Sequence, residues 1–101
     1  MLRATEKAIT ERIITTALQA GFLVGVRADD SADIDPTDNL AEILDSAFSY
    51  DCVDLILEGL DSYSFIYLNF FNDGLDIITD YSTSLEKFVS GLSFKKLEID
   101  L

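Results

Sequence analysis

Carboxylates dominate the chemistry that this sequence could perform. Nineteen Asp and Glu residues face seven Lys and Arg residues, the formal net charge is -12, and the chain contains no His. From residue 28 to residue 86 there is no Lys or Arg at all. A run of one sign repels itself in a folded chain, because no interspersed cations offset it. The run therefore indicates either a surface that serves solubility alone or one suited to a positively charged partner.

Several kinds of catalytic and metal site lack the residues that they need. Without His there is no Ser-His-Asp triad and no His-ligated zinc, and a single cysteine, Cys52, forms neither an internal disulfide nor a cysteine zinc cluster. The acidic segment 29–38 fails the EF-hand pattern, because Ile34 and Leu40 take its sixth and twelfth positions when counted from Asp29. We therefore expect no enzyme, no catalytic residue, no metal site and no cofactor.

Charge and hydropathy also limit the partners. An acidic surface repels phosphate, so we expect no direct binding to nucleic acid and none to an anionic membrane. The most apolar run, residues 13–26, is shorter than the ~20 residues that cross a bilayer, and the first residues lack the layout of a secretory signal. These features predict a soluble intracellular protein.

The elements that must position the carboxylates follow from hydrophobic spacing. Predicted helices cover residues 5–20, 40–50 and 83–91, and predicted strands cover residues 22–27, 53–58, 63–71 and 75–81. Residues 29–38, rich in Asp and Ser, are predicted to form a loop, and residues 95–101 an edge strand. Asn72-Asp73-Gly74 predicts a tight hairpin turn, because Asp-Gly adopts positive φ angles at low cost.

These elements define a fold class. Their order, α-β-α-β-β-β-α, predicts a single acidic α+β domain over residues 1–101. An antiparallel sheet of three to five strands, with a β-meander at residues 53–81, would pack with three helices.

Strand geometry places four of the acids in two rows. Asp54 and Glu58 share one face of the first meander strand, and Asp76 and Asp80 share one face of the third, two strands or about 10 Å away. Tyr67 lies between the rows, and an aromatic ring framed by carboxylates suits an arginine. We therefore expect these five residues to bind a partner. Four acids of segment 29–38 would add to the field: Asp29, Asp30, Asp33 and Asp35. Alternatively, a helix covers this face and its aromatic residues belong to the core.

The segment Tyr67 to Ser82, YLNFFNDGLDIITDYS, resembles a segment of small phage and prophage proteins. In them an aromatic strand, an Asn-Asp-Gly turn and a strand ending in Asp-Tyr follow a helix like that at 40–50. The likeness spans residues 40–90, implies an origin in a mobile element and transfers no functional residue. By size and charge the chain also resembles anti-CRISPR and antirestriction proteins. That resemblance implies an inhibitor of a basic, nucleic-acid-handling protein, such as a nuclease or CRISPR effector, acting in the host cytoplasm by mimicking nucleic acid or blocking its groove.

Two other functions fit the same residues. An immunity or antitoxin-type protein would use an acidic surface to neutralise a basic toxin. A phage structural or assembly protein would instead bury the aromatic face against a second copy, as a homodimer or larger homo-oligomer.

Overall fold

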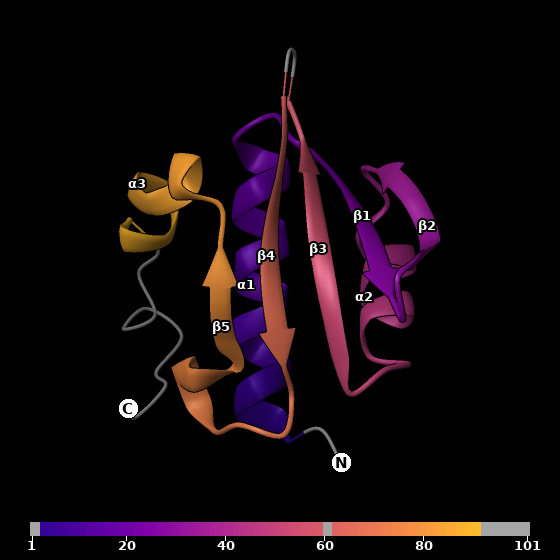
Figure 1. Ribbon diagram of the computed structural model, residues 1–101, viewed down its shortest axis with the longest axis vertical. Helices are drawn as coiled ribbons and strands as arrows, with labels where there is room; N and C mark the ends of the chain where they lie inside the picture. Colours follow the sequence, from indigo (N-terminus) through magenta and orange to yellow (C-terminus); the bar gives the residue numbers. More distant parts are fainter. Residues whose placement is uncertain (1–2, 60–61, 92–101) are drawn as a thin grey trace.

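The computed structural model describes residues 3–59 and 62–91, in which five strands form one antiparallel sheet (Figure 1). The spatial order is β2-β1-β3-β4-β5. The strands are β1 (Leu23–Ala28), β2 (Ser31–Thr37), β3 (Cys52–Glu58), β4 (Tyr63–Asn69) and β5 (Ile78–Tyr81). The helices are α1 (Ala4–Gln19), α2 (Leu40–Ala47) and α3 (Glu86–Ser90), with short 3-10 helices η1 (Gly74–Ile77) and η2 (Thr83–Leu85). The predicted α+β class and the antiparallel sheet with three helices are confirmed.

The core lies between the sheet and the two longer helices. Helix α1 buries Ile9, Ile13 and Ala17, which recur every four residues and so share one helix face. Figure 1 shows α1 behind the sheet and α2 behind β1 and β2. Both helices therefore cover the same side, which we call the helix-covered face.

Strands β3 and β4 alternate strictly between the two faces of the sheet. Leu55, Leu57, Ile66 and Leu68 are fully buried under the helices, while the intervening residues are half-buried or exposed on the other side. No helix in the described part of the chain lies over this second side (Figure 1), which we call the open face. The sequence left open that a helix covers the face carrying Asp54 and Tyr67. Helices α1 and α2 do not cover that face.

The segment predicted as a loop at 29–38 contains a strand instead. Asp29 and Asp30 have φ angles of 52° and 64°, and they join β1 to β2 as a two-residue turn closed by the pairing of Ala28 with Ser31. Positive φ at both turn residues is the geometry of a type I′ hairpin. Strand β2 has only a weak apolar alternation, Ala32, Ile34 and Pro36, because it is an edge strand exposed along most of its length, with Pro36 where an edge tolerates it.

The tight hairpin predicted at Asn72-Asp73-Gly74 is wrong. Gly74 has a positive φ of 56°, but Asp73 has a φ of -108°, so the two residues do not form a type I′ turn. Gly74 instead begins η1, and β5 starts only at Ile78. Ile77 is fully buried, so η1 contributes to the core before the chain returns to the sheet.

The remaining differences lie at element ends. Helix α2 ends at Ala47, three residues early, and the helix predicted at 83–91 is divided into η2 and α3. Asn39 caps α2 by accepting a hydrogen bond from the Glu42 N–H (3.1 Å). The edge strand predicted at 95–101 falls outside the described residues.

Candidate protein-binding face

Four residues of the open face form a line across four strands. The registers pair Arg27 of β1 with Asp54 of β3, Asp54 with Tyr67 of β4, and Tyr67 with Asp80 of β5. We call these four residues the charged row. Asp54 and Asp80 are two strands apart with Tyr67 between them, as predicted, and this spacing corresponds to about 10 Å. The row thus presents an aromatic ring with one carboxylate on each side of it.

The pKa of the Asp54 carboxylate reflects the negative charge of this face. Partial burial is the main cause that raises its pKa, and the negative charges of Asp30 and Asp80 raise it further, while Arg27 opposes them. A raised pKa means that the ionised form is disfavoured where it lies. A cation placed over the row would relieve this repulsion.

Arg27 is the only Lys or Arg within the five strands. Its guanidinium turns toward the β1–β2 turn and donates to the backbone carbonyl of Asp30 (3.4 Å). It forms no ion pair with any carboxylate among residues 3–59 and 62–91. One arginine therefore offsets only part of the negative charge on the open face.

The other described cations lie off the strands: Arg3, Lys7 and Arg12 lie in α1 or just before it, on the helix-covered face, and Lys87 lies in α3. Arg3 pairs with Glu6 (2.9 Å between Nε and Oε1) and with Asp73. The Lys7 ammonium lies 5.8 Å from the centre of the Phe48 ring. The positive residues at the start of the chain therefore do not neutralise the charged row.

A hollow of about 200 Å³ lies beside the charged row. Cys52 and Tyr67 line it, and the nearby Cys52 side chain is the main cause that raises the pKa of the Tyr67 phenol. Asp29 and Asp30 line the same hollow, so the β1–β2 turn brings these two predicted acids to the row. Five of the nine predicted residues thus meet at one place: Asp29, Asp30, Asp54, Tyr67 and Asp80.

Glu58 and Asp35 lie further along the open face. Glu58 pairs with Tyr63 across β3 and β4, and the nearby Glu58 carboxylate is the main cause that raises the pKa of the Tyr63 phenol. Asp35 lines a second hollow, of about 380 Å³, together with Tyr63 and Ile56. This second hollow is lined mostly by apolar residues and adjoins the first at Arg27.

The structure separates Asp76 and Asp33 from the row. Asp76 was predicted on the third meander strand, but it lies in η1 because the connection after β4 is longer than a tight hairpin. Asp33 accepts hydrogen bonds from the hydroxyl groups of Ser46 and Tyr50 (2.7 Å for Tyr50) and so ties β2 to the α2 region. These bonds, that of Ser46 foremost, lower the pKa of Asp33. Its carboxylate is therefore already engaged.

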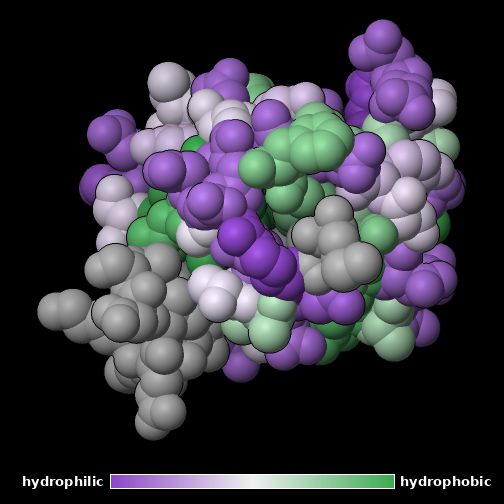
Figure 2. All heavy atoms as spheres, turned by 90° about the horizontal axis from the view of Figure 1, so that it is seen from below, coloured by the Kyte–Doolittle hydropathy of each residue, from purple (hydrophilic) through white to green (hydrophobic). Residues whose placement is uncertain are grey.

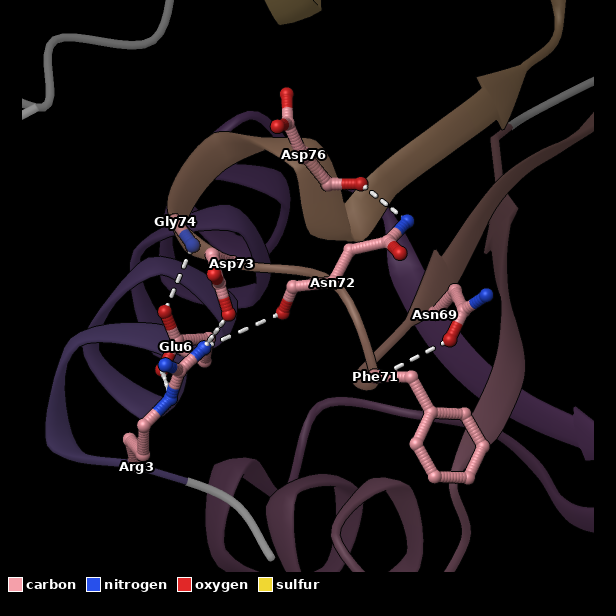
Figure 3. Close-up of polar contacts among 8 residues, drawn as sticks. All are labelled: Arg3, Glu6, Asn69, Phe71, Asn72, Asp73, Gly74 and Asp76. Atoms are coloured by element: carbon pink, nitrogen blue, oxygen red, sulfur yellow. Dashed lines mark hydrogen bonds and ion pairs between the residues drawn. The ribbon is translucent and has the colours of Figure 1, made fainter.

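A polar cluster at the lower end of the molecule was not predicted from the sequence. Glu6 is 3% exposed, and its carboxylate accepts a hydrogen bond from the Gly74 N–H (2.7 Å) besides pairing with Arg3 (Figure 3). Because Arg3 also contacts Asp73, the cluster fastens η1 to the first turn of α1. The spacing of Arg3 and Glu6 was the only local signal, and it could not reveal Gly74, which is 68 residues away.

Phe71 stands next to this cluster and points away from it (Figure 3). Its side chain is 71% exposed, and its backbone N–H donates to the Asn69 side chain (3.0 Å). Seen from this end, hydrophilic side chains cover much of the surface, and hydrophobic side chains gather at several places between them (Figure 2).

Among the described residues, no three His, Cys, Asp or Glu side chains converge in a way that could hold a metal ion. No helix in residues 3–59 and 62–91 is both long enough and apolar enough to cross a membrane.

Comparisons of this chain with protein-family models, with curated proteins and with solved structures found no match.

Proposed function

We propose that this chain is an acidic inhibitor that binds a basic, nucleic-acid-handling protein through the open face of its sheet. The charged row carries the proposal: two carboxylates flank Tyr67 on a face that holds a single cation in its strands. Such a surface attracts Lys and Arg by charge and offers an aromatic ring for contact with a guanidinium. The inhibitor would act stoichiometrically by occupying a cationic groove.

The proposal does not require a close copy of the DNA backbone. Duplex DNA carries one phosphate charge per ~1.7 Å of its axis. Only one pair of row carboxylates spans the sheet, because Asp76 lies outside it. Blocking a groove with a few well-placed acids therefore fits better than mimicry of a phosphate series.

The test is inhibition of DNA cleavage by a panel of purified CRISPR effectors and restriction enzymes, titrated with the chain at low and moderate salt. We expect stoichiometric inhibition that weakens as salt rises, because exposed charges are screened. The double variant Asp54→Lys with Asp80→Lys should lose it. The matched control, Glu11→Lys with Asp45→Lys, makes the same change in net charge at exposed helix positions and should retain it.

Equal inhibition by both double variants would remove the open face from the account. Failure to inhibit any nuclease of the panel would count against the partner class. An immunity-type function would use the same face, and it would be recognised by inhibition of a basic toxin instead. A self-assembly function predicts a sedimentation coefficient that rises with protein concentration and falls when Tyr67 is replaced by Ala.

A further inference from the structure

The two hollows of the open face lie one above the other along β3. The apolar hollow includes Ile56, and the acidic hollow includes Asp54. These residues are two positions apart on one strand, so their side chains share a face and lie about 7 Å from each other. Arg27 lines both hollows, so they lie next to each other on this face.

Gly25 shapes the apolar hollow. It is the outward-facing residue of β1 opposite Ile56. A Cβ there would lie 3.0 Å from the Ile34 carbonyl oxygen and 3.0 Å from the Pro36 nitrogen. Glycine therefore lets the edge strand β2 bend over the open face and form a wall of the hollow. The close approach of the β1 and β2 backbones at Gly25 thus forms one side of the hollow.

We propose that the open face binds an extended segment of its partner in which an apolar residue and an arginine are separated by one residue. An extended chain also directs every second side chain to one side with a spacing of about 7 Å. The apolar side chain would enter the hollow beside Ile56, and the guanidinium would meet Asp54 and Asp80 against Tyr67. This inference rests on the proposed function and specifies the part of the partner that is recognised.

The charge on this face supports a cationic residue at the second position. Asp54 is partly buried among negative neighbours, and the wall residue Asp35 adds another carboxylate. Arg27 opposes an arriving cation because it carries the same charge. It would therefore lower affinity and restrict binding to segments that also fill the apolar hollow.

The experiment uses short fluorescent peptides with Ser and Gly flanks and fluorescence anisotropy. The test peptide contains Leu-Thr-Arg, and its matched control contains Leu-Arg-Thr, which has the same composition but places the two side chains on opposite sides of an extended chain. Two further peptides replace Leu or Arg by Ser. We expect the Leu-Thr-Arg peptide to bind about tenfold more tightly than each of the other three, a difference that corresponds to 1.4 kcal/mol.

Two variants of the protein assign the contacts. Ile56→Thr keeps a β-branched strand residue and should weaken the Leu-Thr-Arg peptide to the level of the peptide without Leu. Arg27→Ser should strengthen every Arg-containing peptide severalfold, because it removes the opposing charge. Circular dichroism of both variants establishes that they fold.

The outcomes separate this inference from the proposed function. Equal binding of Leu-Thr-Arg and Leu-Arg-Thr, or no binding of any peptide up to about 1 mM, overturns the spacing rule. Neither result changes the cleavage assay. Selective binding of Leu-Thr-Arg without inhibition of any nuclease would support the segment and refute the nuclease class of partner.

Discussion

The two faces of the sheet are built from the same strands but differ in what holds them. On the helix-covered face, alternate residues of β3 and β4 are fully buried against α1 and α2. On the open face, the intervening residues are half-buried, charged or aromatic, and Asp54 is ionised at a cost. One face therefore stabilises the fold, while the other carries negative charges that are only partly offset by a cation.

This difference shows how one strand can both stabilise the core and present residues for binding. The period of two separates core from surface at each residue, so β4 gives Ile66 and Leu68 to the core and Phe65 and Tyr67 to the open face. Changes on the two faces should consequently affect different measurements. Substitutions under the helices should alter the free energy of unfolding, and substitutions on the open face should alter binding.

The largest expected effect is a comparison of neighbours on β4. Ile66→Ala removes a fully buried side chain and should lower the free energy of unfolding by about 2–5 kcal/mol. Tyr67→Ala, next to it on the open face, should cost less than half as much. Urea denaturation of both variants measures the difference, and equal losses would contradict the separation of the faces.

The second effect concerns the cluster at the lower end of the helix-covered side. Glu6→Gln removes the charge that pairs with Arg3 and weakens the bond from the Gly74 N–H. Because hydrogen bonds to charged groups are the stronger ones, we expect a loss of about 1–3 kcal/mol in the same denaturation experiment. Glu11→Gln, an exposed change on the same helix, is the control and should be near neutral.

A third, smaller effect is the contribution of two aspartates to the pH dependence of stability, which should have opposite signs for Asp33 and Asp54. The pKa of Asp33 lies below the ordinary 3.8 because Ser46 and Tyr50 donate to its ionised form. Asp33 therefore stabilises the fold above pH ~4, and this contribution is lost as the pH falls through its lowered pKa. Asp33→Asn should be less stable than the parent at neutral pH, and the gap should close in acid.

Asp54 should behave in the opposite way. Burial and negative neighbours raise its pKa above 3.8, so the folded state holds its proton more tightly than the unfolded state. Its ionisation destabilises the fold as the pH rises through the raised pKa. Asp54→Asn should therefore be as stable as the parent or more so at neutral pH, as measured by denaturant midpoints at several pH values. A clear loss of stability would show that Asp54 has a structural partner.

Sequence reasoning reached the fold where the hydrophobic period was strong. Ile9, Ile13 and Ala17 marked α1, and alternation in β3 identified which of its residues face the core. Residues 63–71 are apolar on both faces, so strand geometry, rather than alternating hydropathy, placed Tyr67 beside Asp54. It failed at β2, where the alternation of Ala32, Ile34 and Pro36 is weak: Ile34 is the only large aliphatic residue, and the Asp and Pro residues favour a turn. Arg27 was missed as a member of the row, because the pairing of β1 with β3 is a long-range contact that local patterns do not encode.

The turns at Asp29-Asp30 and Asp73-Gly74 also show that local sequence alone does not determine the structure. Asp73-Gly74 had the sequence of a tight hairpin but does not form one, because the Glu6 carboxylate holds the Gly74 N–H at the start of η1. Asp29-Asp30 does form the tight turn, although neither residue is glycine. Tertiary contacts overrode the stronger local preference in the first case, and strand pairing imposed positive φ angles in the second.

The smallest predicted effect tests that turn at the acidic edge of the open face. Asp30 has a φ of 64°, which glycine adopts at less cost, so Asp30→Gly should raise the free energy of unfolding by up to about 1 kcal/mol. Asp30→Asn removes the same charge while keeping a side chain that tolerates this backbone, and it separates the two contributions. Both variants should lower the pKa of Asp54, measured by NMR titration, because Asp30 is one of the charges that raise it. An unchanged Asp54 pKa would mean that the turn does not contribute to the potential of the charged row, and the role of the open face would then depend on Asp54 and Asp80 alone.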